Sequence, residues 1–174
     1  MRPILIVPGY RDSGEGHWQT LFEARFAGAR RVRMPCFEHP VLPEWVASLD
    51  AAVAGCAQPP VLVAHSLGCI AVAHWARSTT RPVRGALLVA PCDVEKCELP
   101  PALRAFAPAP QGRLEFPSVL VASTDDPYLE LTRAGDLAFA WGSRPHVIAG
   151  AGHINVASGH GDWPYGEALL SAML

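Results

Sequence analysis

Six short segments of the chain carry the residue pattern of β-strands. They are residues 3–7, 31–34, 61–65, 85–90, 118–123 and 145–148. In most of them apolar residues follow one another without polar alternation, which is typical of parallel strands that are covered on both faces. The short segment 31–34 is expected at an edge of the sheet.

Between these segments, apolar residues recur at helical spacing. The predicted helices cover residues 17–27, 44–56, 67–77, 128–140 and 164–174. In the second of them Trp45, Leu49 and Val53 fall on one face. Residues 91–116 are rich in proline and irregular, with one short helix expected around Leu103, and they form either a small lid or a long connection.

Strand and helix alternate about six times along the chain. This alternation predicts a single α/β domain over residues 1–174, with a parallel sheet covered by helices on both faces. In such sheets ligands bind beyond the carboxyl ends of the strands. The residues with candidate chemistry in this chain follow those ends.

The composition fits a folded domain and argues against two classes of partner. Half of the 174 residues are hydrophobic and 17% are charged, as in a well-packed protein. The formal net charge is −2, and the only basic cluster (Arg30, Arg31 and Arg33) is expected to be a solvated loop, so we expect no nucleic-acid partner. No window approaches the roughly 18 apolar residues of a membrane span, so no membrane partner is expected.

The first apolar run and the cysteines bear on location. Pro8 stops the run Ile4–Val7 far too soon for the apolar core of a signal peptide. Five cysteines at irregular spacing do not make a disulfide framework. We therefore expect a cytoplasmic protein with reduced thiols.

The segment 61–70 holds the strongest candidate for chemistry. Its apolar strand leads into Ala-His-Ser-Leu-Gly at 64–68, which matches a nucleophile elbow with alanine at the first small position. A serine at such a turn is strained, and small neighbours let strand and helix backbones approach closely. Its hydroxyl projects above the sheet edge, where amides of a helix N-terminus also point. Ser66 is predicted to be a nucleophile; the alternative is an ordinary serine N-cap.

Polar residues also follow the fifth and sixth predicted strands. Asp125 and Asp126 come directly after the fifth predicted strand, and His153 follows the sixth within a glycine-rich turn. Serine, aspartate and histidine in this chain order are expected of an α/β-hydrolase. His153 would be the general base that activates Ser66, and a carboxylate would orient its ring. Of the two acids we expect Asp126, because Pro127 restricts it to an extended conformation.

Backbone amides at the same sheet edge are predicted to form an oxyanion hole. One comes from Leu67, and the other from Tyr10 or its neighbour, where Gly9 lets the backbone turn inward. The alternative for this second segment is an ordinary Pro-Gly turn. The residues expected to line the substrate pocket are Gly9, Tyr10, Tyr128 and the segments 36–43 and 91–116.

Other motifs give weaker hypotheses. Gly9 and Gly14 have the spacing of a phosphate-binding loop, but Glu15 occupies the lysine position and would repel phosphate. The last three histidines of the chain are spaced by seven without a recognised ligand pattern, so no metal and no cofactor is predicted. His65 is expected to point away from the nucleophile as a structural residue, and His17 to open a helix beneath the first loop.

Motifs spread over nearly the whole chain resemble those of one known family. They are Pro8-Gly9, His17-Trp18-Gln19, Ala64-His65-Ser66-Leu67-Gly68, Asp125-Asp126-Pro127, Gly152-His153 and Gly161-Asp162-Trp163-Pro164. This set resembles the small serine hydrolases grouped with retinoblastoma-binding protein nine and its bacterial relatives. The resemblance implies a compact α/β-hydrolase with a triad of Ser66, Asp126 and His153, little or no lid, and activity on small esters. The Leu-x-Cys-x-Glu string for binding pocket proteins does not occur, so that function is not implied.

These observations combine into one main hypothesis and two alternatives. We expect six parallel strands in the order 2-1-3-4-5-6, and a serine hydrolase that cleaves small acyl esters through an acyl-enzyme on Ser66. Thioester or amide cleavage would use the same residues. A binding protein on a hydrolase scaffold, with weak or no catalysis, is the alternative from another class; the sequence does not identify a protein partner.

Overall fold

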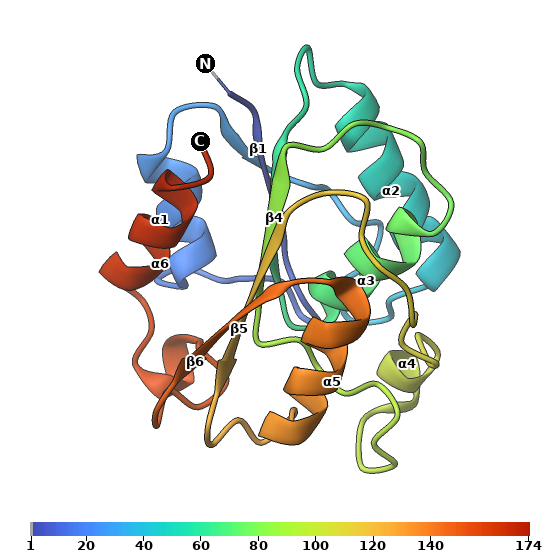
Figure 1. The fold of residues 1–174 in the computed structure, drawn as a ribbon, viewed down its shortest axis with the longest axis vertical. Helices are drawn as coiled ribbons and strands as arrows, with labels where there is room; N and C mark the ends of the chain where they lie inside the picture. Colours follow the sequence, from blue (N-terminus) through green and yellow to red (C-terminus); the bar gives the residue numbers. More distant parts are fainter. Residues whose placement is uncertain (1) are drawn as a thin grey trace.

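The computed structural model describes residues 2–174, and these residues form a six-stranded parallel sheet. The strands are β1 (Ile4–Val7), β2 (Ala29–Arg31), β3 (Val61–His65), β4 (Gly85–Val89), β5 (Ser118–Ser123) and β6 (Arg144–Ile148). Their order across the sheet is β2-β1-β3-β4-β5-β6 (Figure 1), which confirms the predicted order and fold class.

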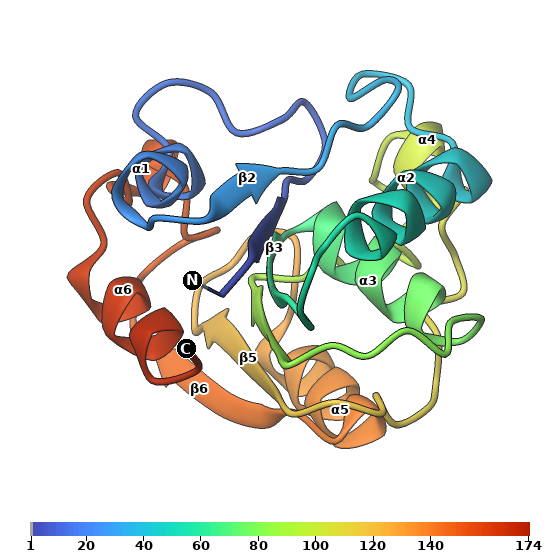
Figure 2. The same ribbon diagram turned by 90° about the horizontal axis from the view of Figure 1, so that it is seen from above.

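Helices cover both faces of this sheet. They are α1 (Trp18–Arg25), α2 (Leu42–Ala54), α3 (Leu67–Ala76), α4 (Pro101–Arg104), α5 (Leu131–Trp141) and α6 (Pro164–Ser171), with a short 3₁₀ turn at Val156–Ser158. Seen from above, α1 and α6 lie on one side of the sheet, and α2, α3 and α5 lie on the other (Figure 2).

Alternating residues of the central strands explain why these strands are apolar throughout. Ile4 and Ile6 of β1 belong to the core beneath α1 and α6, whereas Leu5 and Val7 belong to the core beneath α2, α3 and α5. Successive side chains of a strand point to opposite faces, so a strand between two helical layers needs apolar residues at every position.

The edge strand β2 differs from its prediction. It covers Ala29–Arg31 rather than 31–34, because Ala29 pairs with Ile4 in the ladder with β1. Val32 is buried beyond the end of the strand, which explains the misleading apolar pattern. The arginine cluster is also not simply a solvated loop: Arg31 lies in β2 and forms an ion pair with Glu23.

Residues 91–116 form a long connection that is anchored in the core. Their one helix, α4, is the short helix expected around Leu103. Leu99, Leu103 and Phe106 are all buried within the cluster beneath α2 and α3. The segment therefore packs as a fixed wall instead of covering the sheet edge as a separate lid.

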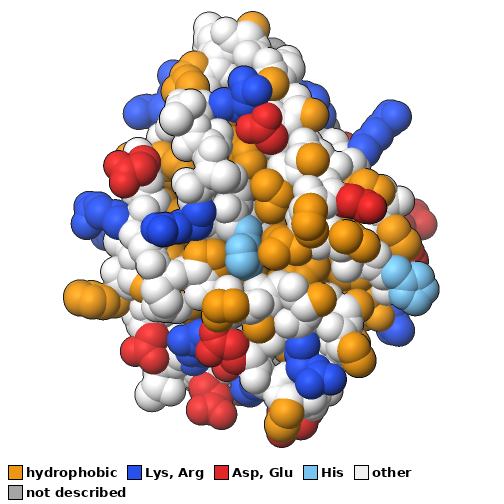
Figure 3. All heavy atoms as spheres, turned by 90° about the vertical axis from the view of Figure 1, so that its right-hand side faces the viewer, with side chains coloured by type: hydrophobic (Ala, Val, Ile, Leu, Met, Phe, Trp, Pro, Cys, Tyr) orange, Lys and Arg blue, Asp and Glu red, His pale blue; other side chains and the backbone are white. Residues whose placement is uncertain are grey.

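The lengths of the helices and the charges on the surface bear on the expected partners. In the described part of the chain, no helix combines the length and apolar character needed to cross a membrane. On the face shown in Figure 3, basic and acidic side chains are interspersed.

Candidate active site

Ser66 occupies a strained turn between β3 and α3. Its backbone has φ 53° and ψ −122°, a region that residues with a side chain rarely adopt. The Ser66 N–H donates to the Val89 carbonyl of the neighbouring strand at 3.0 Å, which fixes the turn to the sheet. Ser66 is the N-cap residue of α3, but its side chain makes no capping hydrogen bond, so it is not an ordinary serine N-cap.

Two glycines bring this turn into close contact with the turn that follows β1. A Cβ atom on Gly68 would lie 2.4 Å from the Val7 carbonyl oxygen, and one on Gly9 would lie 2.9 Å from Ser66 Cβ. The small residues thus allow α3 to approach the end of β1 rather than its own strand. Leu67 is the first residue of α3, so its N–H has no partner within the helix.

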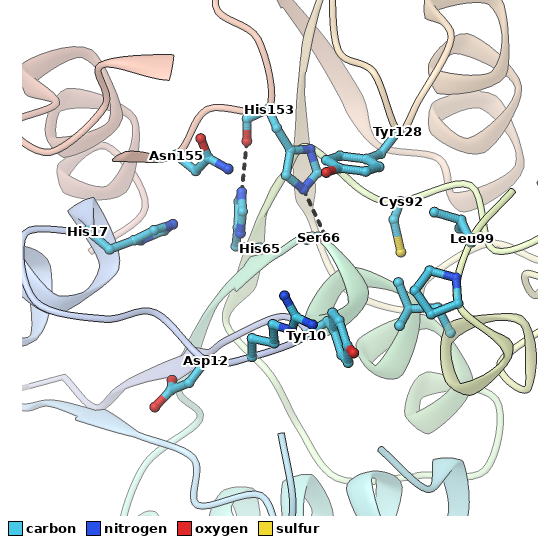
Figure 4. Close-up of a pocket in the computed structure, with 13 residues that line it drawn as sticks. Tyr10, Asp12, His17, His65, Ser66, Cys92, Leu99, Tyr128, His153 and Asn155 are labelled. Carbon is cyan, nitrogen blue, oxygen red and sulfur yellow. Dashed lines mark hydrogen bonds between the residues drawn. The ribbon is translucent and has the colours of Figure 1, made fainter. Parts of the chain in front are cut away.

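The structure brings together Ser66, His153 and Asp126 from three different loops. Figure 4 shows His153 pointing towards Ser66. His153 Nε2 lies 2.9 Å from Ser66 Oγ, and His153 Nδ1 lies 2.9 Å from Asp126 Oδ2. A carboxylate can only accept, so Nδ1 carries the proton and Nε2 is free to accept from the serine hydroxyl. All three residues are about 8% exposed.

Asp125 faces a different group from Asp126. Its Oδ1 accepts from Ser123 Oγ at 2.6 Å and from the Gly152 N–H at 2.8 Å. These two hydrogen bonds lower the pKa of the Asp125 carboxyl. Asp125 therefore holds the turn that carries His153, without contacting the imidazole itself.

Two further histidines lie beside His153, one of them against expectation. His65 lines the same cavity as Ser66, and its Nε2 donates to the His153 carbonyl at 2.9 Å, so its predicted orientation away from the nucleophile is wrong. Burial holds the pKa of His65 well below its usual value, which keeps the ring neutral. His17 is the N-cap residue of α1, at the start of the helix as expected, and its ring lies 5.0 Å from the His65 ring.

A cavity of about 360 Å³ opens at Ser66. Its lining consists of Tyr10, Arg11, Asp12, His17, His65, Ser66, Cys92, Leu99, Pro100, Leu103, Tyr128, His153 and Asn155. Tyr10 and Tyr128 thus lie where substrate contacts were predicted, whereas Gly9 lies behind the wall against Ser66. The expected lining from residues 36–43 is wrong: Phe37 instead accepts the N–H of the lining residue Arg11.

A family model described as serine hydrolase matches residues 4–172. The chain belongs to the serine hydrolase family. A solved structure described as a YdeN-like hydrolase from Pectobacterium atrosepticum is 32% identical to this serine hydrolase, with a TM-score of 0.88, and the match covers 99% of this chain and 90% of that one.

More distant structures share the fold. The ydeN gene product of Bacillus subtilis is 23% identical with a TM-score of 0.82, covering 99% of this chain and 98% of that one. The esterase RhEst1 from a Rhodococcus species is 14% identical with a TM-score of 0.70, covering 99% and 90%. Comparison with curated proteins gave no match.

These comparisons confirm a small serine hydrolase of the α/β-hydrolase type. The particular relation to retinoblastoma-binding protein nine stays a prediction, because the relatives found carry other names. Within residues 2–174, no group of three or more His, Cys, Asp or Glu side chains is arranged to hold a metal ion.

Proposed function

We propose that this serine hydrolase is a carboxylesterase-like enzyme that cleaves small acyl esters through an acyl-enzyme on Ser66. The observation that carries the proposal is the chain of hydrogen bonds from Ser66 Oγ through His153 to Asp126 at the wall of the cavity. A serine hydroxyl is a weak nucleophile at neutral pH unless a base within hydrogen-bond reach accepts its proton.

Each group has one task in the proposed reaction. Ser66 Oγ attacks the acyl carbon while His153 Nε2 accepts its proton, 2.9 Å away. The imidazolium then donates this proton to the leaving alkoxide, and a water molecule activated by the same base releases the acid. Asp126 keeps the proton on Nδ1 and stabilises the imidazolium.

Backbone amides of Leu67 and Tyr10 are proposed to hold the oxyanion of the tetrahedral intermediate. The close approach of Gly9 to Ser66 supports this pairing, because it places the turn after β1 next to the start of α3. Loss of one such donor typically lowers kcat by about 10²–10³.

Replacement of the nucleophile tests the proposal. Ser66→Ala should lower kcat for p-nitrophenyl acetate on the order of 10⁶-fold, since the members of such a triad act as a unit. A fluorophosphonate probe should label the wild-type protein and leave Ser66→Ala unlabelled. A folded wild-type protein that neither hydrolyses small esters nor reacts with the probe would support the binding-protein alternative instead.

A cytoplasmic location is part of the same proposal. All five cysteines (Cys36, Cys56, Cys69, Cys92 and Cys97) are free in the structure, as the irregular spacing predicted. Free thiols are the usual state in a reducing compartment.

A further inference from the structure

The cavity at Ser66 has two walls of unlike chemistry. One wall comes from Cys92, Leu99, Pro100, Leu103 and Tyr128, and the other from Arg11, Asp12, His17 and Asn155. Figure 4 shows Ser66 between them, with His17 and Asn155 on one side and Cys92, Leu99 and Tyr128 on the other. A substrate whose acyl carbon sits at Ser66 therefore extends one arm along an apolar wall and one arm along a polar wall.

His17 offers a hydrogen-bond donor to the polar wall. Its Nδ1 accepts from the Gln19 N–H at 3.1 Å, so this nitrogen carries no proton. Burial, reinforced by the nearby Arg31, lowers the pKa of His17 to about 4, which keeps the ring neutral at neutral pH. A neutral imidazole with a bare Nδ1 carries its hydrogen on Nε2. In Figure 4 this end of the ring points towards the cavity.

Asn155 offers a second donor. Its Oδ1 accepts from the Ser158 N–H at 3.1 Å in a capping box, and this fixes which end of the amide faces outward. The Nδ2 group, with two hydrogens, makes no hydrogen bond within residues 2–174 and lies at the cavity.

Arg11 supplies the unpaired charge of this wall. Its guanidinium lies 5.1 Å from the centre of the Tyr10 ring, and it forms no ion pair within the part of the chain that the structure describes. Asp12, by contrast, is bound to Arg31 at 2.7 Å, and its carboxylate points away from Ser66 in Figure 4. The wall therefore presents donors and one positive charge, with its one acid already paired.

We propose that the substrate is an ester with a short apolar arm and a second arm that bears a carboxylate, held by Arg11, His17 and Asn155. A carboxylate is acceptor-only and matches a set of donors. Its single charge also matches the single guanidinium, whereas a phosphate monoester dianion would leave a negative charge uncompensated. This inference rests on the proposed esterase function and adds the substrate class to it.

Matched pairs of esters test the inference. Phenyl hydrogen succinate carries the carboxylate on the acyl arm, and para-acetoxybenzoate carries it on the alcohol arm; the methyl ester of each is the neutral partner. The readout is the ratio of kcat/KM for charged over neutral ester, measured by phenol release. Comparing this ratio between protein variants cancels the intrinsic reactivity of each ester.

Arg11→Met is the test variant, and Arg84→Met is its control. Arg84 is exposed and directly precedes β4, at the opposite end of the sheet from the cavity. For at least one pair, Arg11→Met should lower the charged-to-neutral ratio roughly 10- to 100-fold, since this variant removes a charge-assisted hydrogen bond. Arg84→Met should leave the ratio unchanged. Equal ratios in wild type and Arg11→Met for both pairs would overturn the inference.

Binding to Ser66→Ala separates this inference from the proposed esterase function. Binding of the same four esters to Ser66→Ala, which cannot turn them over, is measured by titration calorimetry. If wild type hydrolyses none of them, while Ser66→Ala binds a charged ester and Ser66→Ala/Arg11→Met does not, the esterase proposal fails and the carboxylate-binding site at Arg11 stands. If Ser66→Ala binds charged and neutral partners equally well, the inference is wrong.

Discussion

The adjacent acids Asp125 and Asp126 serve different partners at the same loop. Asp126 accepts from His153 Nδ1 and also from the Tyr128 N–H at 2.9 Å, so its carboxylate is held from both sides. Asp125 accepts from the Gly152 N–H, one residue before the imidazole. Asp126 thus contacts the His153 ring, and Asp125 positions the backbone next to His153.

Replacing each acid by asparagine separates these roles. Asp126→Asn should lower kcat by about 10⁴, because an amide favours the wrong tautomer of His153. Asp125→Asn keeps an oxygen that can accept from Gly152, so its kcat should fall far less. Steady-state kinetics with one soluble ester measure both variants. The reverse ranking would transfer the orienting role to Asp125, and two near-wild-type variants would refute the triad.

Local motifs were sufficient to predict that Ser66 and His153 lie together, and the proline after Asp126 favoured the acid that contacts the imidazole in the structure. The positions of His65 and Asn155 at the cavity were missed, because they depend on contacts that no local pattern encodes. His65 donates to a carbonyl 88 residues away. Its place directly before the nucleophile was the one available signal, and strand alternation suggested the opposite orientation.

At the scale of elements, α3 approaches the end of β1 closely enough to exclude a side chain at Gly68. The nearest atoms to an added Cβ are the carbonyl oxygens of Val7 and Pro8 at 2.4 and 2.6 Å, and both belong to the backbone. Backbone atoms cannot rotate away, so a larger residue must move α3 or the turn after β1. Either shift would separate the proposed oxyanion amides.

Gly68→Ala should therefore destabilise the fold and lower kcat together. Gly135 in α5 provides the matched control, because an added Cβ there meets nothing within 4 Å. Gly135→Ala should raise the free energy of unfolding by about 0.5–1 kcal/mol, as expected for a helix interior. Urea unfolding and ester kinetics on both variants check this. A Gly68→Ala protein as stable and active as Gly135→Ala would show that the contact is not tight.

The accuracy of the predicted elements followed their burial. The boundaries of β3 and β5 were predicted to the residue, because both strands are apolar and end at polar groups or turns. α5 begins at Leu131, three residues later than predicted, because the Tyr128 N–H is taken by Asp126 and the chain turns there. β2 was misplaced because pairing with β1, rather than its own composition, sets its register.

At the scale of the whole molecule, neutral histidines buried beside charged groups make stability depend on pH. His17 is packed near Arg31, Asp12, His65 and His153, and its pKa falls from 6.5 to about 4. Between these two values the unfolded chain binds a proton on His17 that the folded chain does not. The free energy of unfolding therefore falls as the pH drops through this window, by up to about 3 kcal/mol from this residue.

His17→Asn should make the free energy of unfolding less dependent on pH. Asparagine keeps an acceptor for the Gln19 N–H at the start of α1 but does not titrate. Between pH 6.5 and pH 4 the loss of unfolding free energy should be smaller in the variant by up to about 3 kcal/mol. Chemical unfolding at a series of pH values measures the free energy of unfolding of both proteins. If this free energy changes equally with pH in the wild type and the variant, His17 is not held neutral.

The anchored segment 91–116 also limits substrate size. Leu99 and Leu103 are 7% and 6% exposed, so the wall is packed from behind and cannot open without breaking the core. We expect kcat/KM to be higher for p-nitrophenyl acetate and butyrate than for octanoate and palmitate, without activation at a lipid interface. A sharp rise in rate above the solubility limit of a long-chain ester would contradict this.

The backbone at Ser66 has a consequence for how this sequence is maintained over time. A left-handed conformation of this kind costs on the order of 1–3 kcal/mol, and a glycine at the same place would release most of that strain. In a lineage that does not need a nucleophile, replacing Ser66 by glycine would therefore increase the stability of the fold. Selection for reactivity would be needed to retain serine at this position, and we expect a descendant that only binds ligands to lose it.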